Sequence, residues 1–307
     1  MDKLGLGYKT LSEINPGLIY AVISGYGLTG PYLQRPAFDL IGQAVAGIMD
    51  AQGNPDRPPG VMFADLVSGA YCALGALIAL IQRGKTGKGQ IVDISMQEVM
   101  YSHHFQQLSD RALLPVKEMM DSFIGRSVIE MLTDWADPMF FWNSYRTKDG
   151  YVAIVALTER QWANLIKAAG KPELATDERF SNIVGRIKNN HDVRGIVEEW
   201  TSSKTTAEIV EELNANRVPC GAVAKRSELT TDHQLRDRGV FKNVNHPRFG
   251  SIEINANPIR LSGYPEPEYS AAPDIGANTI DVLARIAGLS QKELESLSSE
   301  GVIFTQT

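Results

Sequence analysis

Asp65 is the residue whose type and position most clearly suggest chemistry. It stands directly before a long apolar run, Leu66–Ile81, in which apolar side chains recur every three to four positions as in a helix. A carboxylate at the start of a helix is stabilised in its charged form by the helix dipole and free backbone N–H groups. Such a carboxylate can act as a covalent nucleophile without a separate base. An N-cap aspartate with a purely structural role has the same local pattern, so the local sequence leaves both interpretations open.

The predicted helix is followed by a basic, glycine-rich turn, Arg83–Gln90, and then by a predicted strand, Gln90–Ser95. Gly84 is the expected end of the helix. The turn has some likeness to a phosphate-binding loop, but such a loop opens a helix and spaces its glycine and lysine differently. A solvated turn and a peripheral phosphate contact both remain open for it. The apolar run is shorter than the roughly 20 residues of a membrane span, so we expect a buried core helix.

A second candidate region lies upstream of Asp65. The apolar segment Leu18–Ile23 predicts a strand buried on both faces, and the glycine-rich loop Gly25–Pro31 follows it. In α/β folds, ligands bind at this place, after a strand. Next come Arg35–Phe38 and a predicted helix from about Phe38 to Met49. The loop and its arginine are either an ordinary turn with a surface side chain or one wall of a nucleotide-like site.

The rest of the chain gives a mixed pattern. From about Lys117 to Trp142 it is rich in methionine and aromatic residues, which suits either a core or a cleft for acyl chains. The other predicted elements are a helix from Met96 to about Leu114, a strand at Gly150–Leu157, helices after Thr158, His191 and Thr205, a strand pair within 240–262, and closing helices at Ile275–Ala287 and Gln291–Ser298. Capping boxes are expected at Thr205 and Ser290. Strands alternating with helices predict an α/β protein with a largely parallel sheet, and the middle third a separate α+β unit.

Composition argues against several functional classes. A formal net charge of -6 does not favour a nucleic acid or an anionic membrane as partner. Cys72 and Cys220 are too few for a disulfide framework or a zinc site, and they fit a reducing, cytoplasmic compartment. His103 and His104 have no partners at metal-ligand spacing, so we expect no metal. The sequence also lacks a G-x-S-x-G motif.

A family resemblance is carried by six segments that follow one another along nearly the whole chain. They are SGYGLTGPY, RPAFDLIGQAVAG, PPGVMFADLVSGAYCALGALIALIQRGKTGKGQIVDISM, GYVAIVALTERQWANLIKAAGKPEL, DERFSN and VPCGAV. Together they resemble the class III CoA-transferases of the CaiB/BaiF type. That group contains formyl-CoA and carnitinyl-CoA transferases and also the α-methylacyl-CoA racemases.

The resemblance implies that Asp65 is the catalytic nucleophile. It would carry CoA from an acyl-CoA donor to a carboxylic acid acceptor through an aspartyl anhydride and an aspartyl-CoA thioester, without a metal. The family's CoA contacts fall on Arg35, Pro36, Ala37 and Phe38. Racemases of the superfamily carry a histidine where this chain has Phe38, so the resemblance favours a transferase. An acyl-CoA racemase or epimerase is the alternative.

The resemblance also implies a fold and an assembly. We expect a large α/β domain with a Rossmann-like parallel sheet at 1–120, a small α+β domain at 121–240, and a segment at 241–307 that returns to the large domain. Family members form interlocked homodimers and usually begin further upstream. We therefore expect this chain to lack the N-terminal part of the large domain. A truncated, inactive paralogue, or one subunit of a two-chain transferase whose partner supplies that part, is therefore a further alternative to an active transferase.

Overall fold

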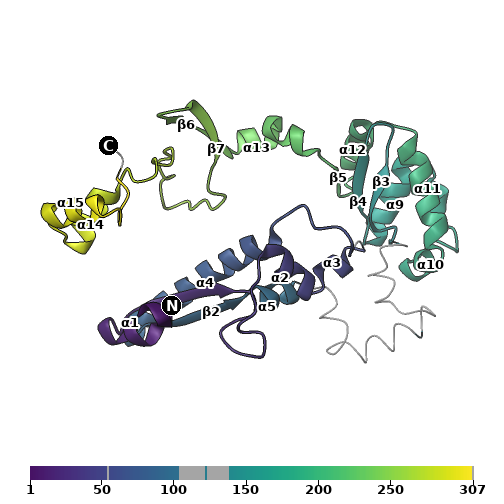
Figure 1. Ribbon diagram of the computed structural model, residues 1–307. Helices are drawn as coiled ribbons and strands as arrows, with labels where there is room; N and C mark the ends of the chain where they lie inside the picture. Colours follow the sequence, from purple (N-terminus) through teal and green to yellow (C-terminus); the bar gives the residue numbers. More distant parts are fainter. Residues whose placement is uncertain (54, 104–121, 123–137, 306–307) are drawn as a thin grey trace. The chain divides into compact units, whose positions relative to one another are not determined.

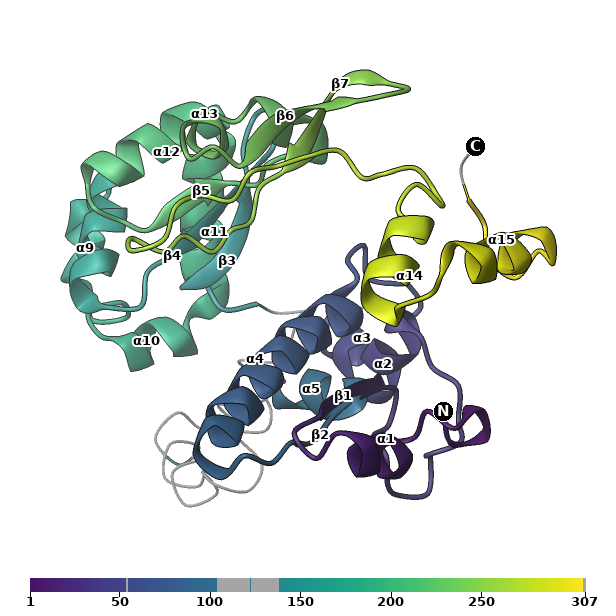
Figure 2. The same ribbon diagram turned by 90° about the vertical axis from the view of Figure 1, so that its left-hand side faces the viewer.

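The computed structural model describes residues 1–53, 55–103, 122 and 138–305 (Figures 1 and 2). The chain divides into two compact units, Met1–Val223 and Ala224–Thr307. Helices combine with one parallel and two antiparallel sheets, which confirms the predicted α/β class. The domain boundaries expected at residues 120 and 240 stay predictions.

The first part of the chain forms a β-α-β unit. Strands β1 (Ile19–Ser24) and β2 (Gln90–Ser95) pair in parallel, and the long helix α4 (Phe63–Thr86) runs beside both of them, as both views show. Ser24 pairs with Ser95, so the carboxyl ends of the two strands meet at one edge. The other elements of this part are η1 (Asp2–Leu4), α1 (Tyr8–Ile14), α2 (Asp39–Val45), α3 (Ile48–Ala51) and α5 (Met96–Ser102).

The two predicted ends of α4 are wrong. The N-cap residue is Met62, which makes no side-chain cap, and Asp65 is the third residue of the helix. At the other end the helix passes Gly84 and stops before Gly87, whose positive φ of 70° lets its N–H bond the carbonyl of Arg83 at 2.8 Å. Gly87 ends the helix because it is the glycine that adopts the left-handed conformation.

The predicted burial of α4 is also wrong. Its buried residues are Ala64, Ser68 and Ala79 alone, and much of its apolar face is exposed. The more than half-exposed side chains include Leu66, Leu74, Leu77, Ile78 and Ile81. A 24-residue helix is about 36 Å long, whereas each six-residue strand spans about 20 Å, so two strands cannot cover it. Among the described residues, α4 is also the one helix long and apolar enough to cross a membrane, a test that core helices pass as well.

Two further predictions for this part are wrong, and two others fall mainly on residues that the structure does not describe. The helix expected from Phe38 to Met49 is split into α2 and α3 at Gly47, which has a φ of 83°. Strand β1 is present, but its residues are half-buried or exposed because β2 is its one strand partner among the described residues. The second half of the helix predicted to reach Leu114, and most of the methionine-rich stretch, lie outside the described residues.

The middle part is an antiparallel sheet with helices. Its sheet has the order β3 (Trp142–Arg146), β4 (Tyr151–Val155) and β5 (Cys220–Ala222). The helical elements are α9 (Glu159–Ala168), η2 (Pro172–Ala175), α10 (Ile183–Lys188), α11 (Asn190–Ser202) and α12 (Thr206–Ala215). Capping boxes at Thr158 and Thr205 open α9 and α12, and the one at Thr205 confirms the sequence prediction. The core is built on Phe140, Ile154, Trp162, Phe180 and Leu213.

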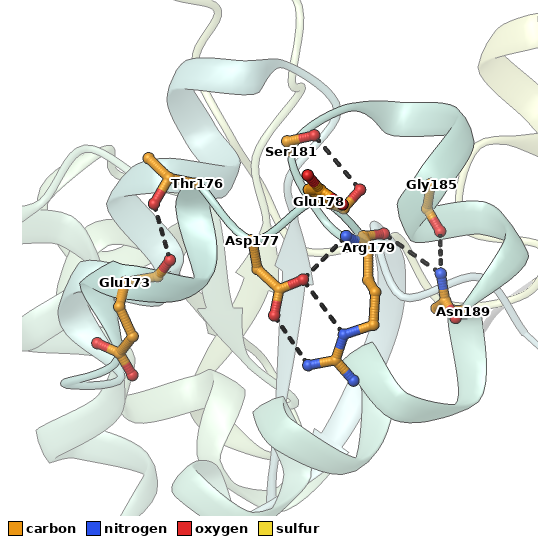
Figure 3. A network of polar contacts seen from close by, with 8 residues as sticks. All are labelled: Glu173, Thr176, Asp177, Glu178, Arg179, Ser181, Gly185 and Asn189. Carbon is orange, nitrogen blue, oxygen red and sulfur yellow. Dashed lines mark hydrogen bonds and ion pairs between the residues drawn. The ribbon is translucent and has the colours of Figure 1, made fainter.

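The DERFSN segment, 177–182, forms the turn before α10 (Figure 3). The Arg179 guanidinium faces the Asp177 carboxylate and donates from Nε at 3.2 Å and from Nη2 at 2.8 Å. Asn182 caps α10 by accepting the N–H of Gly185 at 2.9 Å. Asn189 Nδ2 donates to the Arg179 and Gly185 carbonyls. These contacts give this stretch a structural role.

The second unit contains a β-hairpin and helices. Strands β6 (Phe241–His246) and β7 (Gly250–Asn255) pair antiparallel, which confirms the predicted strand pair. The helical elements are η3 (Arg226–Thr231), α13 (His233–Asp237), α14 (Thr279–Ala287) and α15 (Gln291–Ser299). Helix α15 opens with the capping box predicted at Ser290.

Candidate active site

Asp65 lies in the first turn of α4, and its side chain is exposed. Its carboxylate has no hydrogen-bond or ion-pair partner among the residues the structure describes. In the same turn, the backbone N–H of Phe63, a half-exposed residue, also lacks an acceptor within the described part of the chain, whereas Ala64 is fully buried. The first N–H groups of a helix point outward and carry its positive end. The exposed carboxylate therefore lies in the same helical turn as a backbone donor that could stabilise a developing oxyanion.

The backbone of Asp65 is held by a second carboxylate. Its N–H donates to Oδ1 of Asp39 at 3.0 Å, and Asp39 is the first residue of α2. Oδ2 of Asp39 accepts from Nε2 of Gln43, one turn further along α2, at 2.6 Å. Asp39 thus performs for α4 the capping function that Met62 cannot perform. It does so from the start of α2, 26 residues before Asp65 in the chain.

Sequence reasoning missed the contacts that Asp39 and Gln43 make with the start of α4. The available signal was an acid and an amide four residues apart at a helix start, directly after the Arg35–Phe38 segment. That spacing places two side chains on the same helix face. It does not reveal that the acid reaches the N–H of Asp65, because that contact depends on how α2 packs against α4.

Arg35 lies on an aromatic stack at the surface. Its guanidinium carbon is 3.7 Å from the centre of the Tyr32 ring, and the Tyr26 ring meets Tyr32 edge-on at 5.5 Å. An arginine over an aromatic face is held by a cation–π attraction while its N–H groups stay available at the edge of the plane. The side chain is exposed, so this arrangement can present a fixed cation to an anionic ligand.

The remaining residues of the RPAF segment connect this stack to the helix that carries Asp39. Pro36 is exposed and Ala37 is half-buried against the end of β1, where a methyl group added at Gly25 would lie 2.4 Å from the Ala37 Cβ. Phe38 is the N-cap residue of α2 and is 80% exposed. Because Asp39 follows Phe38 directly, the structure brings the RPAF segment and Asp65 to the same region.

The Gly25–Pro31 loop is fixed at the carboxyl edge of the two strands. Gly27 donates its N–H to Oγ of Ser24 at 2.9 Å, and Leu28 donates to Oδ2 of Asp93 at 3.0 Å. Gly27 has a φ of 84°, which a residue with a side chain rarely adopts. This edge is where an open α/β sheet binds its ligands.

The basic turn after α4 belongs to the opposite end of the helix from Asp65, about 30 Å away along its axis. It closes α4 and opens β2, and Arg83 Nη1 donates to the carbonyl of Gly17 at 3.1 Å. These contacts support the solvated-turn interpretation. His103 lies at the end of α5 with Nδ1 2.8 Å from the Val99 carbonyl, and His104 lies outside the described residues. Within the described residues, no group of three or more potential metal ligands occurs.

A hollow of about 610 Å³ lies within the second unit, between residues 237–242 and 257–269. None of the predicted site residues lines it. We place the candidate active site at Asp65 nevertheless, because an exposed carboxylate and an exposed backbone donor lie in the same helical turn there.

Comparisons with known proteins identify the family of this chain. The model of the family described as CoA-transferase family III matches residues 1–279. The beta subunit of succinyl-CoA–L-malate CoA-transferase from Chloroflexus aurantiacus is 33% identical over 99% of this chain and 74% of the relative. Formyl-CoA:oxalate CoA-transferase from Streptomyces coelicolor is 30% identical over 99% of this chain and 75% of the relative.

A solved structure has a similar fold. The CAIB/BAIF family protein from Brucella suis superposes with a TM-score of 0.70 at 30% identity, over 92% of this chain and 71% of that one. The resemblance found in the sequence is therefore confirmed. From the family match and these relatives, the chain belongs to CoA-transferase family III and is a CoA-transferase.

Proposed function

We propose that Asp65 is the covalent nucleophile with which this chain transfers CoA from an acyl-CoA to a carboxylic acid. The observation that carries the proposal is the exposed Asp65 carboxylate in the first turn of α4, which has no partner among the described residues while the backbone N–H of the same residue is fixed by Asp39. A nucleophile needs a free carboxylate on a fixed backbone, because small displacements of a reacting group slow a reaction strongly.

The proposed relay has four steps. A carboxylate oxygen of Asp65 attacks the thioester carbonyl, the C–S bond breaks, and a mixed anhydride and CoA thiolate form. The thiolate then attacks the side-chain carbonyl of Asp65, which releases the donor acid and leaves an aspartyl-CoA thioester. The acceptor carboxylate attacks that thioester and expels the thiolate again. Finally the thiolate attacks the new acyl group, which gives the product acyl-CoA and restores Asp65.

The chain's own groups have distinct parts in these steps. Each attack creates a negative oxygen, and the N–H group of the half-exposed Phe63 is the donor of the first helical turn that could stabilise it. For the CoA portion we propose contacts from Arg35, Pro36, Ala37 and Phe38. Arg35 suits a phosphate group, since guanidinium is a fixed planar donor for phosphate oxygens.

We further propose that the acceptor is a small dicarboxylic acid. The names of the two relatives above pair CoA transfer with L-malate and with oxalate, both of which are dicarboxylic acids. Phe38 has no titratable group, so it offers no base for proton exchange at a substrate carbon. This supports acyl transfer over racemisation.

The proposed assembly is a homodimer in the cytoplasm. The exposed apolar face of α4 supports association, because monomers rarely expose large contiguous apolar patches. Both cysteines are free in the structure, as a reducing compartment would leave them. Sedimentation of the purified chain as a monomer would contradict the dimer.

The test of the proposed function is trapping of the covalent intermediate. The purified chain is incubated with succinyl-CoA or formyl-CoA and hydroxylamine, and the Asp65 peptide is examined by mass spectrometry for the hydroxamate. Asp65→Asn should lose the adduct and at least about 10³-fold in transfer rate to oxalate or malate, as expected for removal of a nucleophile. Asp50→Asn is the matched control, because Asp50 is also an exposed helical aspartate of this part.

Transfer by Asp65→Asn at the native rate would refute the proposal. α-Deuterium incorporation without an acceptor acid would favour racemisation.

A further inference from the structure

We propose that Gln43 is a positioning residue for the nucleophile. It acts through Asp39 and fixes the part of α4 that carries Asp65. The inference rests on the proposed function, since it assigns Gln43 a role only if Asp65 reacts. It does not require Gln43 to touch a substrate.

The side-chain amide of Gln43 is fixed by two acceptors. Its Nε2 donates to Oδ2 of Asp39 at 2.6 Å and to the backbone carbonyl of Val61 at 3.0 Å. An amide nitrogen has two hydrogens, and both are used. Because a carboxylate oxygen and a carbonyl oxygen can only accept, the nitrogen must occupy this position, and the orientation of the amide is unambiguous.

The same amide links two points that flank the start of α4. Val61 precedes the N-cap Met62, and Asp65 lies three residues beyond Met62. Gln43 holds Val61 directly and holds the N–H of Asp65 through Asp39. The two contacts thus fix the backbone on either side of Met62, the N-cap residue, which makes no side-chain cap. A rotation of the Asp39 carboxylate would release the Asp65 backbone, and Gln43 is the group that prevents it.

Gln43 places a polar amide in a fully buried position, which is unfavourable unless the amide is hydrogen-bonded. Gln43 is fully buried, and its Oε1 has no hydrogen-bond partner among the described residues. An unsatisfied buried oxygen is unfavourable, and an apolar side chain of similar size would avoid that penalty. The hydrogen bonds that the structure records for this buried amide are those of Nε2. Those contacts lead to the candidate nucleophile.

Gln43→Met tests the inference, because methionine has a similar length and cannot donate. Two quantities are measured: the rate at which the Asp65 adduct forms in a single turnover with succinyl-CoA, and KM for the same substrate. We expect the adduct rate to fall about 10- to 100-fold while KM changes less than about threefold, since the nucleophile is displaced and the CoA contacts are not. Gln97→Met is the matched control: Gln97 also donates to a backbone carbonyl, that of Val45, but does not contact Asp39. It should keep the native adduct rate.

A double-mutant cycle keeps the test decisive if the buried substitution also lowers stability. Asp39→Ala removes the link between Gln43 and the Asp65 N–H at its other end. Asp39 is only half-buried, so this substitution disturbs the core less than one at Gln43. If Gln43 acts through Asp39, Gln43→Met should cost little further adduct rate in the Asp39→Ala background. The positioning role would be overturned if the losses of adduct rate in the two single variants multiplied in the double variant. It would also be overturned if Gln43→Met kept the native adduct rate while Asp65→Asn was inactive. Native transfer by Asp65→Asn would instead refute the proposed function.

Discussion

Gly42→Ala should destabilise the part of the chain that carries the candidate site, although alanine normally stabilises a helix. Gly42 lies in the middle of α2, between Asp39 and Gln43 in the chain, and it is buried. A Cβ at this position would lie 3.0 Å from the Cβ of Ala64 and 3.1 Å from the Cβ of Met96. Both neighbours are atoms attached directly to a helix backbone, so they cannot rotate away. Helix α2 would have to move from α4 and α5 by a few tenths of an ångström.

Two opposing contributions determine the size of the effect. Replacing glycine by alanine inside a helix gains about 0.8–1.0 kcal/mol. Adding a methyl group to a tightly packed contact costs about 1–3 kcal/mol. Gly84→Ala in α4 is the matched control, because nothing lies within 4 Å of the added Cβ and only the gain remains. We therefore expect the two variants to differ by about 1–3 kcal/mol in local opening free energy.

Amide hydrogen exchange measured on peptides from β1 and β2 is the suitable assay. All four tryptophans lie beyond residue 103, so tryptophan fluorescence would not report on this part of the chain. The expected difference corresponds to about 5- to 150-fold in exchange protection between the Gly42→Ala and Gly84→Ala variants. Gly42→Ala should also slow CoA transfer, because α2 carries Asp39. Equal protection in both variants would refute the argument that α2 packs too closely for a side chain at this position.

Two predictions concern the middle part, where urea unfolding can be followed by tryptophan fluorescence. Arg186→Met should lower the free energy of unfolding by about 2–4 kcal/mol, since the fully buried guanidinium donates to the Phe180 carbonyl at 2.7 Å and to Glu159 at 2.8 Å. The hydrogen bond from Arg186, and then its charge, hold the pKa of Glu159 below its ordinary value of 4.5. A lowered carboxyl pKa stabilises the fold above that value and ceases to do so as the pH falls through the folded-state pKa. The difference in unfolding free energy between the native chain and Arg186→Met should therefore shrink below about pH 4.5. A difference that stays constant with pH would show that Arg186 does not lower the pKa of Glu159. Thr205→Ala should cost about 1 kcal/mol, because its hydroxyl caps α12 within the capping box with Glu208; an unchanged urea midpoint would show that this cap contributes nothing.

Features with a complete local signal could be predicted from the sequence. Strand β2 has the predicted bounds, and the capping boxes at Thr205 and Ser290 open helices as expected. In each case the residues that decide the structure lie within a few positions of one another. The strand pair β6–β7 is similar, because its two strands are joined by a short turn.

Features that depend on distant partners could not be predicted. Strand β5 has only three residues, and it is a strand because it pairs with β4, which lies far earlier in the chain. The role of Asp65 as an N-cap was predicted from its type and its neighbours, yet the cap comes from Asp39. The burial of α4 was predicted from its composition, but burial depends on how much sheet is present to cover it.

The remote cap has a chemical consequence for the site. Asp65 occupies the third position of α4, where an acidic side chain usually reaches back to the N-cap N–H in a capping box. Such a box requires a hydroxyl at the N-cap, and Met62 has none. Because Asp39 caps the helix from α2, the N-terminal turn is stabilised without use of the Asp65 side chain. A local cap would have committed that carboxylate to the backbone. The cap from α2 leaves it available to a substrate, which explains why the residues that prepare the candidate nucleophile lie in a different helix.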